Sequence, residues 1–386
     1  MILPGATLGI LGGGQLGRLF VRAARTMGYA VVVLDPEPDC PAAQWADKHI
    51  RASYTDHGAL EELAQECAAI TTEFENIPAS ALDYLAGARP VRPSGAVLAI
   101  TQDRICEKNF LRSNGFATAA FVAVEQRLAL PAALKHIASP ALLKTSRTGY
   151  DGKGQRGVRT LGEAEMAFAD LGGRPCILEA RVDIQMEISL MIARGVDGNV
   201  VAYPISENKH RDGILDVSIV PARISPELAE HATQIAIRIA ELLNYCGVMA
   251  VEFFVAQDDQ LLVNEIAPRP HNSGHYTVDA SVTSQFEQQV RALCGLPLGD
   301  TSLLSTAVMV NILGNLWRGD QAPPWDRVLS HPRAKLHLYG KRHARPGRKM
   351  GHFTYLSESV EDALSQALAI QAALSCPEPF PAREYG

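Results

Sequence analysis

The first hundred residues alternate between two hydrophobic periodicities. Ala6 to Leu11 is a short apolar run that ends in glycines, and residues 16–27 then carry apolar side chains at helical spacing. A second apolar run, over residues 29–34, closes with Asp35. A strand, a glycine turn, a helix and a second strand form a βαβ unit, whose crossover requires a parallel sheet. We therefore predict an α/β domain over residues 1–106.

After residue 106 the pattern changes to strands joined by glycine-rich loops, which is typical of α+β folds. Ser225 and Pro226 mark a helix start, because Ser is a good N-cap and Pro fits the first helical position; the helix should reach Asn244. We predict a domain over 107–296 and a last segment over 297–386. Strands are expected at residues 141–144, 176–179, 187–192, 200–204, 248–255, 261–267, 307–313 and 335–339, with a helix at 360–374.

The composition is that of a globular protein without a strong charge bias. The 386 residues, of which 47% are hydrophobic and 20% charged, are enough for two or three domains. The 36 basic and 42 acidic side chains give a net charge of −6, which provides no overall attraction for nucleic acid or an anionic membrane. We predict neither as a partner, so an anionic ligand must bind at a local basic site.

Cysteine usage indicates the compartment. The seven cysteines include no CxxC pair, which argues against a structural zinc site or a disulfide framework and favours the reducing cytoplasm. The N-terminal segment lacks the charged start of a signal peptide, and no apolar run approaches the about 18 residues that span a bilayer. We expect a soluble cytoplasmic protein.

A first candidate motif is Gly12 to Gly17, which reads G-x-G-x-x-G between a predicted strand and a predicted helix. In dinucleotide-binding enzymes such glycines let a pyrophosphate approach the helix N-terminus, and an acid such as Asp35 holds a ribose. An NAD-dependent oxidoreductase is therefore one hypothesis. The same turn also serves strand-to-helix junctions that pack against another ligand or domain.

A second candidate is the segment from Lys144 to Gly157, which has four glycines within nine residues and begins with a lysine at a strand end. Backbone N–H groups of such a loop can cover phosphates. The P-loop pattern G-x-x-x-x-G-K-[ST] is absent. An exposed hairpin would explain the glycines but not the functional side chains crowded beside them, which are Lys144, Tyr150, Asp151 and Lys153.

A third candidate is a pair of glutamates on two consecutive apolar strands. If Asp258 and Asp259 form the centre of the turn, Glu252 lies directly opposite Glu265, with Cβ atoms about 5 Å apart. Two such carboxylates repel each other unless a proton or a cation lies between them. Oxygen ligands near a phosphate-covering loop favour Mg²⁺ held jointly with nucleotide phosphates. A pair of solvated strand glutamates is the alternative.

Two further clusters are polar or basic. Arg269, His271, Asn272 and Ser273 follow closely after Glu265, and strand alternation would place Arg269 beside the carboxylates. Between Lys341 and Lys349, five of nine residues are Lys or Arg, a concentrated anion site suited to a substrate phosphate. A nucleic-acid patch is the alternative, although no interleaved aromatic residues support it.

Together these motifs resemble the ATP-grasp superfamily and, within it, the family of N5-carboxyaminoimidazole ribonucleotide synthetases. The resemblance runs through eight ordered segments: GILGGGQLGR, TTEFENI, QDRICEKNFL, LKTSRTGYDGKGQ, YPISENKHRDGIL, LLNYCGVMAVEFF, NEIAPRPHNSGH and LHLYGKRHARPGRKMGH. It implies a Rossmann-like pre-ATP-grasp domain over 1–106, an ATP-grasp domain with a lid at about 116–182, and a C-terminal segment that completes the substrate site. It also implies a homodimer.

The family reaction is ATP- and bicarbonate-dependent carboxylation of 5-aminoimidazole ribonucleotide through carboxyphosphate, in de novo purine biosynthesis. The resemblance implies two Mg²⁺ ions on Glu252 and Glu265, with Asn264 beside them. For ATP it implies contacts from Arg104, Lys144, Gly149, Tyr150, Asp151, Gly152, Lys153, Gly154, Gln155, Glu179, Ala180, Arg181, Val182, Glu187 and His210. For the ribonucleotide it implies Tyr150, Asp151, Lys153, Arg269, His271, Asn272, Ser273, Lys341 and Arg348.

Some assignments stay open at this point. Lys144 and Arg269 should stabilise the charge that develops during phosphoryl transfer, while Asp151 and His271 compete as the acceptor of the amine proton. The adenine linker, residues 179–182, lacks one acid and one aromatic residue that are usual in the family. Ala267 stands where many ATP-grasp enzymes have an Asn metal ligand. A formate-dependent glycinamide ribonucleotide transformylase is the alternative within the superfamily.

Overall fold

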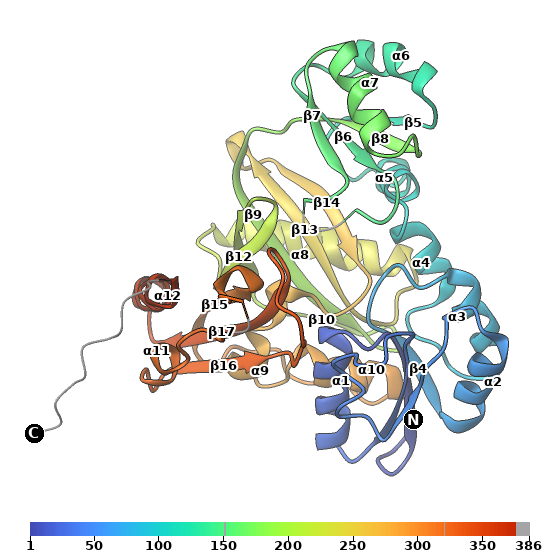
Figure 1. Cartoon of the computed structure of the whole chain (residues 1–386), viewed down its shortest axis with the longest axis vertical. Helices are drawn as coiled ribbons and strands as arrows, with labels where there is room; N and C mark the ends of the chain where they lie inside the picture. Colours follow the sequence, from blue (N-terminus) through green and yellow to red (C-terminus); the bar gives the residue numbers. More distant parts are fainter. Residues whose placement is uncertain (150–151, 320, 376–386) are drawn as a thin grey trace, which may run out of the picture.

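The computed structural model describes residues 1–149, 152–319 and 321–375. The described chain forms three sheets, one at the N-terminus, one in a protruding lid and a large one between them that extends to the C-terminal part (Figure 1). The mixture of parallel and antiparallel sheets confirms the predicted combination of α/β and α+β architecture.

The N-terminal domain is built on a four-stranded parallel sheet in the order β3-β2-β1-β4. The predicted βαβ unit is present, because β1 pairs in parallel with β2 across helix α1. Buried aliphatic side chains cover both faces of this sheet. Its elements are β1 (Thr7–Leu11), α1 (Gln15–Thr26), β2 (Ala30–Leu34), β3 (Lys48–Ile50), α2 (His57–Glu66), β4 (Ala69–Thr72), α3 (Ala79–Ala86) and α4 (Gly95–Thr101).

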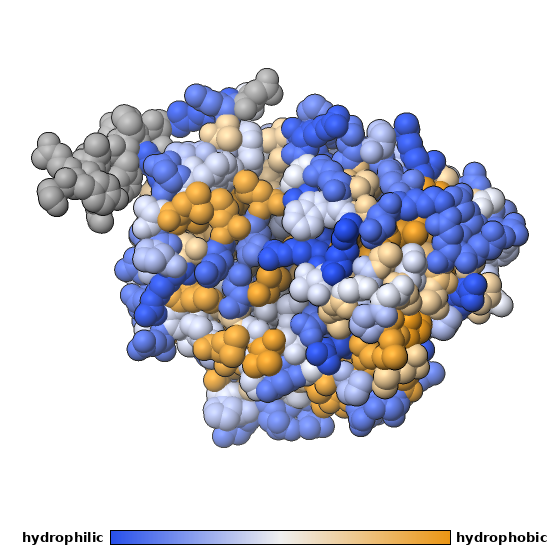
Figure 2. All heavy atoms as spheres, turned by 90° about the horizontal axis from the view of Figure 1, so that it is seen from below, coloured by the Kyte–Doolittle hydropathy of each residue, from blue (hydrophilic) through white to orange (hydrophobic). Residues whose placement is uncertain are grey.

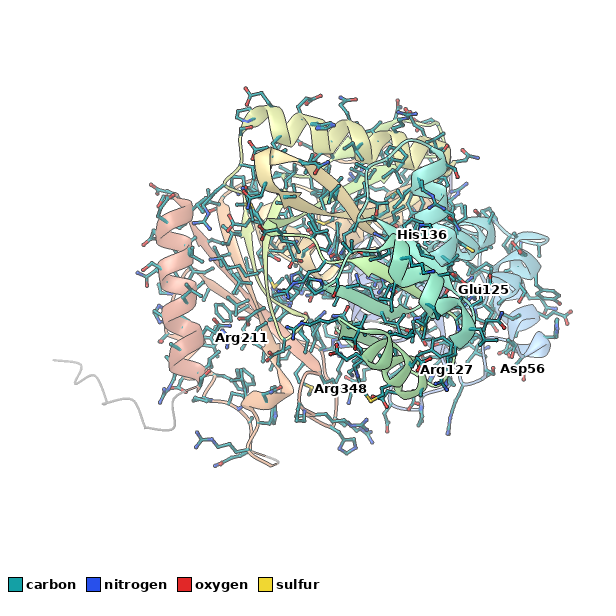
Figure 3. All side chains as sticks on the ribbon, turned by 90° about the horizontal axis from the view of Figure 1, so that it is seen from above. Asp56, Glu125, Arg127, His136, Arg211 and Arg348 are labelled. Carbon is teal, nitrogen blue, oxygen red and sulfur yellow. The ribbon has the colours of Figure 1, made fainter. Side chains whose placement is uncertain are left out.

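The lid is a four-stranded antiparallel sheet in the order β5-β8-β6-β7, with helices α6 and α7 packed on it. Seen from above, the lid lies in front of the central sheet and carries Arg127 and His136 (Figure 3). Helix α5 leads into it from the N-terminal domain. The elements are α5 (Arg104–Ser113), β5 (Phe121–Val124), α6 (Leu130–His136), β6 (Ala141–Thr145), β7 (Gln155–Val158), α7 (Leu161–Asp170) and β8 (Cys176–Ala180).

The large sheet has nine strands, of which eight follow the order β14-β13-β9-β11-β12-β15-β17-β16 while β10 pairs with β9. Helix α8 begins as predicted, with the Ser225 side chain accepting a hydrogen bond from Leu228 N at 3.2 Å. The elements are β9 (Ile184–Arg194), β10 (Val200–Ala202), β11 (Ser206–Arg211), β12 (Ile214–Val220), α8 (Pro226–Leu242), β13 (Gly247–Ala256), β14 (Leu261–Ala267), α9 (Thr277–Ala280), α10 (Gln285–Cys294), β15 (Thr306–Leu313), α11 (Asp326–Leu329), β16 (Ala334–Leu338), β17 (Lys349–Ser357) and α12 (Val360–Ser375).

The boundary expected at residue 296 does not separate two sheets. Strand β12 of the expected ATP-grasp domain pairs directly with β15 of the C-terminal segment, and α12 packs on the sheet they share. The segment over 297–375 therefore extends the central sheet rather than forming its own. The expectation of a loosely held Pro-rich tail falls on residues 376–386, which lie outside the described residues.

Helix α10 joins the N-terminal domain to the central sheet. Its apolar side chains pack among those of α1 and β1, so the core of the N-terminal domain includes a helix far away in sequence (Figure 1). Gln289 on this helix is 1% exposed and bonds both ways: its Nε2 donates to Thr71 Oγ1 at 2.9 Å, and its Oε1 accepts from Val248 N at 2.6 Å. This side chain fixes the two domains to each other.

The surface shows no single large apolar face in the view from below, where hydrophobic side chains form separate patches among polar ones (Figure 2). Among the described residues, no helix has the length and apolar character needed to cross a membrane.

Four aromatic side chains, three of them histidines, stack where β16 and β17 meet the segment after β14. His275 and His352 are both fully buried, and the Tyr339 hydroxyl lies 2.8 Å from His352 Nδ1. His337 stacks on His352 with an interplanar angle of 18° and lies 2.8 Å from Asp279 Oδ2. One ligand atom from each of Asp279, His337 and His352 lies within 4.8 Å of the other two, a spacing at which the three side chains could hold a metal ion.

Burial lowers the pKa of His275 and His352 well below the ordinary histidine value, and neighbouring positive groups add to the effect. The neutral imidazoles are therefore part of the folded state.

We predict that Gln289→Ala lowers the free energy of unfolding by about 1–3 kcal/mol, because Val248 N–H is left without an acceptor in the interior. Urea unfolding measures this change. Gln234→Ala, on the exposed face of α8, is the control and should stay within about 0.5 kcal/mol of wild type. Equal effects of the two substitutions would contradict the bridging role of Gln289.

We also predict that stability falls as the pH drops below about 6.5, the pKa of an unfolded histidine. The depressed folded pKa of His275 and His352 means that the unfolded chain binds more protons in this range, so each residue costs up to about 1.4 kcal/mol per pH unit. Urea unfolding at pH 7.5 and 5.5 should show a smaller loss for His275→Gln than for wild type. The exposed His231→Gln should keep the wild-type pH dependence; an unchanged dependence in His275→Gln would refute the explanation.

Candidate active site

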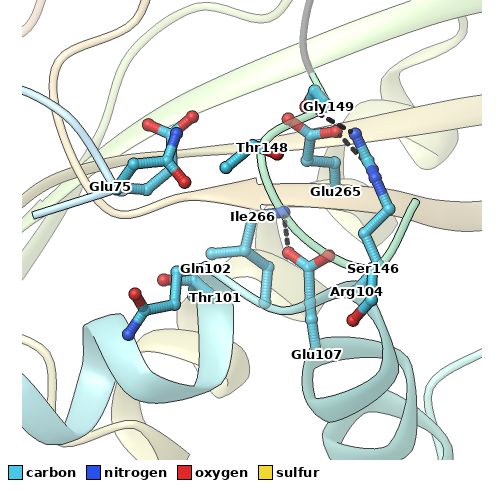
Figure 4. Close-up of a pocket in the computed structure, with 11 residues that line it drawn as sticks. Glu75, Thr101, Gln102, Arg104, Glu107, Ser146, Thr148, Gly149, Glu265 and Ile266 are labelled. Atoms are coloured by element: carbon cyan, nitrogen blue, oxygen red, sulfur yellow. Dashed lines mark hydrogen bonds and ion pairs between the residues drawn. The ribbon is translucent and has the colours of Figure 1, made fainter. Parts of the chain in front are cut away.

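A pocket opens where the N-terminal domain, the lid and the central sheet meet (Figure 4). Polar side chains from all three parts surround it, and Glu265 of β14 lies at its edge. The lining residues are Glu75, Asn76, Thr101, Gln102, Arg104, Glu107, Ser146, Thr148, Gly149, Glu265 and Ile266.

Arg104 connects the lid loop to the central sheet. It is the first residue of α5, whose N-cap Asp103 accepts hydrogen bonds from Ile105 N and from the lid residues Ser146 and Arg147. Its guanidinium lies 2.9 Å from Glu265 Oε2 and donates to Gly149 O at 3.1 Å (Figure 4). Burial opposes the charge, but Glu265 outweighs it and raises the pKa of Arg104. Its expected contact with ATP phosphates stays a prediction.

The β13–β14 hairpin confirms the predicted pairing of Glu252 with Glu265. The turn differs from the expected one, since a 3₁₀ turn over Gln257–Asp259 replaces a turn centred on two aspartates. Near this turn the register is shifted by one residue, and a bulge at Asn264 restores it. Without the bulge Glu252 would lie opposite Asn264, so this irregularity aligns the two carboxylates.

Each carboxylate of the pair has its own nitrogen partner. Glu252 Oε1 lies 2.9 Å from His271 Nε2, while Glu265 is bound by Arg104. Burial would raise the pKa of Glu252, but its contacts with His271, together with the nearby His210 and Lys349, lower this pKa to about 2. Two ionised carboxylates on one face of a hairpin are hard oxygen donors of the kind that Mg²⁺ prefers, so these residues fit the expected metal.

Behind the pair, Glu107 is buried and accepts a hydrogen bond from Ile266 N at 2.6 Å. Burial raises its pKa to about 8, and the charge of Glu265 contributes to the rise. Glu107 was not predicted from the sequence, although this residue lies on the same helix as Arg104. It holds the strand segment that carries Glu265.

Two lysines meet on the buried Glu179 of β8. Lys144 Nζ lies 3.2 Å from Glu179 Oε2, and Lys108 Nζ lies 3.8 Å from Oε1. The Glu179 side chain therefore turns inward to these cations, while the expected adenine linker continues toward the surface with Ala180, Arg181 and Val182. Lys108 was not expected from the sequence, where it is one of many lysines on amphipathic helices.

Glu187 and His210 are brought together by the pairing of β9 with β11. His210 Nδ1 lies 2.9 Å from Glu187 Oε2. Burial would lower the pKa of His210, but Glu187 outweighs it and raises it. The two residues expected at the nucleotide therefore form one acid–base pair.

The glycine-rich loop begins at Gly149, and its expected residues Tyr150 and Asp151 lie outside the described part of the chain. Gly154 O accepts a hydrogen bond from Thr145 N at 2.8 Å, and Gln155 pairs with Lys144 at the start of β7. Lys153 is exposed. Gly152 has a φ of 72°, and a Cβ there would lie 3.1 Å from Asp212 O, so the loop rests against the β11–β12 turn.

The first glycine motif holds a carboxylate of the chain itself. Gly17 N donates to Glu73 Oε2 at 2.7 Å, and Gly14 N donates to Glu73 Oε1. Asp35 accepts from Gly13 N at 2.7 Å and from Tyr54. The N–H groups that would bind a pyrophosphate are thus occupied by an acid, which argues against the NAD hypothesis. Glu73 follows β4 directly, at the carboxyl edge of the parallel sheet where ligand sites of α/β folds occur.

Arg269 lies beside the carboxylates as expected, but not as part of the strand. Strand β14 ends at Ala267, and the Arg269 side chain pairs with Glu75 from the N-terminal domain. Burial would raise the pKa of Glu75, but Arg269 outweighs it and lowers this pKa to about 2. The Arg269–Glu75 pair therefore links the N-terminal domain to the site.

Asn272 and Ser273, expected to contact substrate, are instead buried behind His271. Asn272 exchanges hydrogen bonds with Asn311 of β15 at 3.0 and 2.7 Å. The Ser273 hydroxyl lies 2.8 Å from His271 Nδ1 and is fully buried. Both side chains are used within the protein, and their expected contact with the ribonucleotide stays a prediction. The sequence places them next to His271 but does not reveal which way each points.

The basic segment divides between the two ends of a loop. Lys341 Nζ donates to Gln15 Oε1 at 2.8 Å and to Lys349 O at 2.6 Å, which links it to the start of α1. Arg348 donates to His343 O at 2.8 Å, and burial lowers its pKa. Arg342 pairs with Asp39 at 2.7 Å. Lys341 thus lies close to the glycine motif and Glu73.

Family models match three consecutive parts of the chain. Residues 5–102 match a ribonucleotide synthetase preATP-grasp domain, residues 109–286 an ATP-grasp domain, and residues 307–366 a phosphoribosylaminoimidazole carboxylase C-terminal domain. These ranges follow the order of the described parts.

Individual relatives are similar over nearly the full length. The chain is 47% identical to the N5-carboxyaminoimidazole ribonucleotide synthase of Brucella melitensis, over 91% of this chain and 96% of the relative. A solved N5-carboxyaminoimidazole ribonucleotide synthetase bound to ADP has a TM-score of 0.90 at 43% identity, covering 96% and 97% of the two chains. An Aspergillus clavatus N5-carboxyaminoimidazole synthase in complex with ADP and 5-aminoimidazole ribonucleotide has a TM-score of 0.88 at 30% identity, covering 96% and 98%.

Proposed function

Because this chain belongs to the N5-carboxyaminoimidazole ribonucleotide synthase family of ATP-grasp enzymes, we propose that it carboxylates 5-aminoimidazole ribonucleotide in purine biosynthesis. It is an ATP-dependent carbon–nitrogen ligase. ATP activates bicarbonate as carboxyphosphate, and the carboxyl group passes to the N5 amine with release of ADP and phosphate.

One observation carries this proposal: the cross-strand pair Glu252 and Glu265, aligned by the bulge at Asn264 and faced by Arg104. An acidic pair that selects a divalent cation, next to cations that suit phosphates, is the arrangement that phosphoryl transfer needs. Because Glu73 already occupies the N–H groups of Gly14 and Gly17, the same geometry favours bicarbonate activation by ATP over hydride transfer.

Mg²⁺ bound to these carboxylates supplies charge neutralisation for the phosphates. The side chains of this protein contribute by where they are placed around the substrates. Arg104, which binds Gly149 O, and Lys144, which pairs with Glu179, contact the phosphates, and Arg269 stabilises the charge on the transferred group. Closing the loop over 149–157 excludes water, which protects carboxyphosphate from hydrolysis.

The ribonucleotide occupies the side of the site made by the N-terminal domain and the C-terminal loop. Lys341 and Arg348 bind its phosphate, and Arg269 with His271 lies near its imidazole. Tyr150, Asp151 and Lys153 complete this side from the loop. Lys341 already contacts Gln15 at the glycine motif, which supports a substrate position between the two.

The proposal also covers the number of Mg²⁺ ions, the oligomeric state and the cellular compartment. We assign two Mg²⁺ ions, because each carboxylate has several oxygen lone pairs and the nucleotide offers more ligands than one ion needs. The homodimer implied by the family resemblance is part of the same proposal. We place the enzyme in the cytoplasm, since the six cysteines in the described residues are all free thiols.

The direct test is a coupled assay of ADP release in which each component is omitted in turn. We expect release to need bicarbonate and Mg²⁺ and to rise on addition of 5-aminoimidazole ribonucleotide. Formate with glycinamide ribonucleotide should not substitute. A folded protein whose ADP release ignores bicarbonate and the ribonucleotide would disprove the function, and stimulation by the formate pair would replace it with transformylation.

Glu265→Gln should keep the fold but lose most turnover, because the neutral amide removes a metal ligand charge. We expect kcat to fall by about 100-fold or more, as for loss of a charge-stabilising group. Glu241→Gln, on the exposed side of α8, should retain wild-type kcat. Near-normal turnover by Glu265→Gln with an unchanged melting temperature would remove Glu265 from the metal site.

A further inference from the structure

A line of buried polar side chains crosses the central sheet and ends at His271. Its members come from three adjacent strands and from the segment after β14, and the three serines among them are fully buried. They are Ser218 on β12, Asn208 on β11, Ser189 on β9 and Ser273.

The members are joined at ordinary hydrogen-bond lengths. Ser218 Oγ lies 2.8 Å from Asn208 Oδ1, and Asn208 Nδ2 lies 2.8 Å from Ser189 Oγ. Ser189 Oγ lies 2.7 Å from Ser273 Oγ, which lies 2.8 Å from His271 Nδ1. The chain of contacts is continuous over the width of three strands.

The His271 end sets the direction of the first bonds. A carboxylate only accepts, so the Glu252 oxygen 2.9 Å away requires a proton on His271 Nε2. On the other side of the ring, Ser273 N–H points to Nδ1 at 3.4 Å and can only donate. A neutral imidazole with Nε2–H therefore accepts at Nδ1 from both the backbone and the hydroxyl of Ser273.

The remaining bonds follow in one direction. Since the Ser273 hydroxyl gives its proton to Nδ1, it must accept one from Ser189. Ser189 then accepts from the amide NH₂ of Asn208, whose carbonyl oxygen accepts from Ser218. Asn208 is the one member with a fixed donor end and a fixed acceptor end, so it determines the direction of the hydroxyls beside it.

We propose that Asn208, together with Ser189 and Ser218, is a positioning residue that holds the neutral imidazole of His271 in the tautomer with its proton on Nε2. These hydrogen bonds act on His271 through Ser273, which explains why the Ser273 side chain is buried rather than open to a ligand. His271 then presents a hydrogen-bond donor toward the carboxylates and the substrate.

This assignment rests on the proposed function and deepens it. Sequence reasoning left Asp151 and His271 as competing acceptors of the amine proton. A ring whose Nδ1 is filled by Ser273 and whose Nε2 carries a proton has no free lone pair to accept one. His271 therefore orients and stabilises an oxygen of the carboxyl or phosphate group, and another residue takes the proton.

The test is Asn208→Asp, which nearly keeps the shape of the side chain and should reverse the direction of the hydrogen bonds. In Asn208→Asp the new carboxylate can only accept, so Ser189 and Ser218 both turn their protons toward it. Ser273 must then donate to Ser189, and His271 Nδ1 faces a hydroxyl lone pair. The matched control is Ser206→Ala, another fully buried serine on the same strand, whose hydroxyl contacts the Ser273 carbonyl at 3.5 Å but none of the side chains in the line.

Nitrogen-15 NMR of imidazole-labelled full-length protein reports the tautomer without reference to activity, and His271→Gln identifies the signal. Wild type and Ser206→Ala should show a protonated Nε2 and an unprotonated Nδ1, and Asn208→Asp should show a protonated Nδ1. We expect kcat for ribonucleotide-stimulated ADP release to fall about 10- to 100-fold in Asn208→Asp, with KM for ATP unchanged. Asn208→Ser, which restores a hydroxyl donor toward Ser189, should recover part of kcat.

Each outcome decides the assignment. A protonated Nδ1 in wild type, an Asn208→Asp spectrum equal to wild type, or an equal loss of kcat in Ser206→Ala would overturn it. If wild type shows no ADP release with bicarbonate and the ribonucleotide, the proposed function fails, while the tautomer measurement still confirms or refutes the positioning role on its own.

Discussion

Two glutamates that face each other across a hairpin repel, and much of the site is arranged around the cations that this repulsion demands. Arg104 approaches Glu265 from the base of the lid, and His271 approaches Glu252 from the segment after β14. Both side chains have further partners: Arg104 binds the lid loop at Gly149, and His271 is hydrogen-bonded to the line of buried polar side chains in the central sheet. The acidic pair therefore connects the lid to the interior of the sheet. A divalent cation that binds the pair changes the contacts on both sides.

A second balance of charge lies at the N-terminal domain. The positive end of α1 and the glycine N–H groups are neutralised by Glu73, while Glu75 two residues later neutralises Arg269. Burial raises the pKa of Glu73, whereas Arg269 more than offsets burial at Glu75. Two acids on one short segment thus have different tasks: one closes the glycine turn and the other ties the domain to the carboxylate site.

The sequence predicted the helices and strands that depend on local pattern. It did not predict the contacts that depend on residues far away in the sequence. The βαβ unit, the helix start at Ser225 and the strand over 261–267 depend on spacing and capping, which are local. The pairing of Glu252 with Glu265 was correct although the turn was not, because the bulge at Asn264 offset a shift that no local signal revealed. Glu73, Lys108 and Asn208 could not be assigned, because their partners lie on other elements: Glu73 binds Gly14, Lys108 meets Glu179, and Asn208 binds Ser189. The direction of Ser273 depends on Ser189, a contact between segments 84 residues apart.

The continuous sheet limits how this chain can be truncated. Because β12 pairs with β15 over Val217–Val220, removing the C-terminal strands would leave this stretch of β12 without its partner. A fragment ending before residue 300 would expose the long apolar edge of β12, whose unpaired N–H and C=O groups would recruit strands from other molecules. Its sequence, ILDVSIV, is rich in β-branched residues and lacks proline, which makes that edge prone to aggregation. The C-terminal strands are therefore a structural part of the same sheet that carries the carboxylate pair.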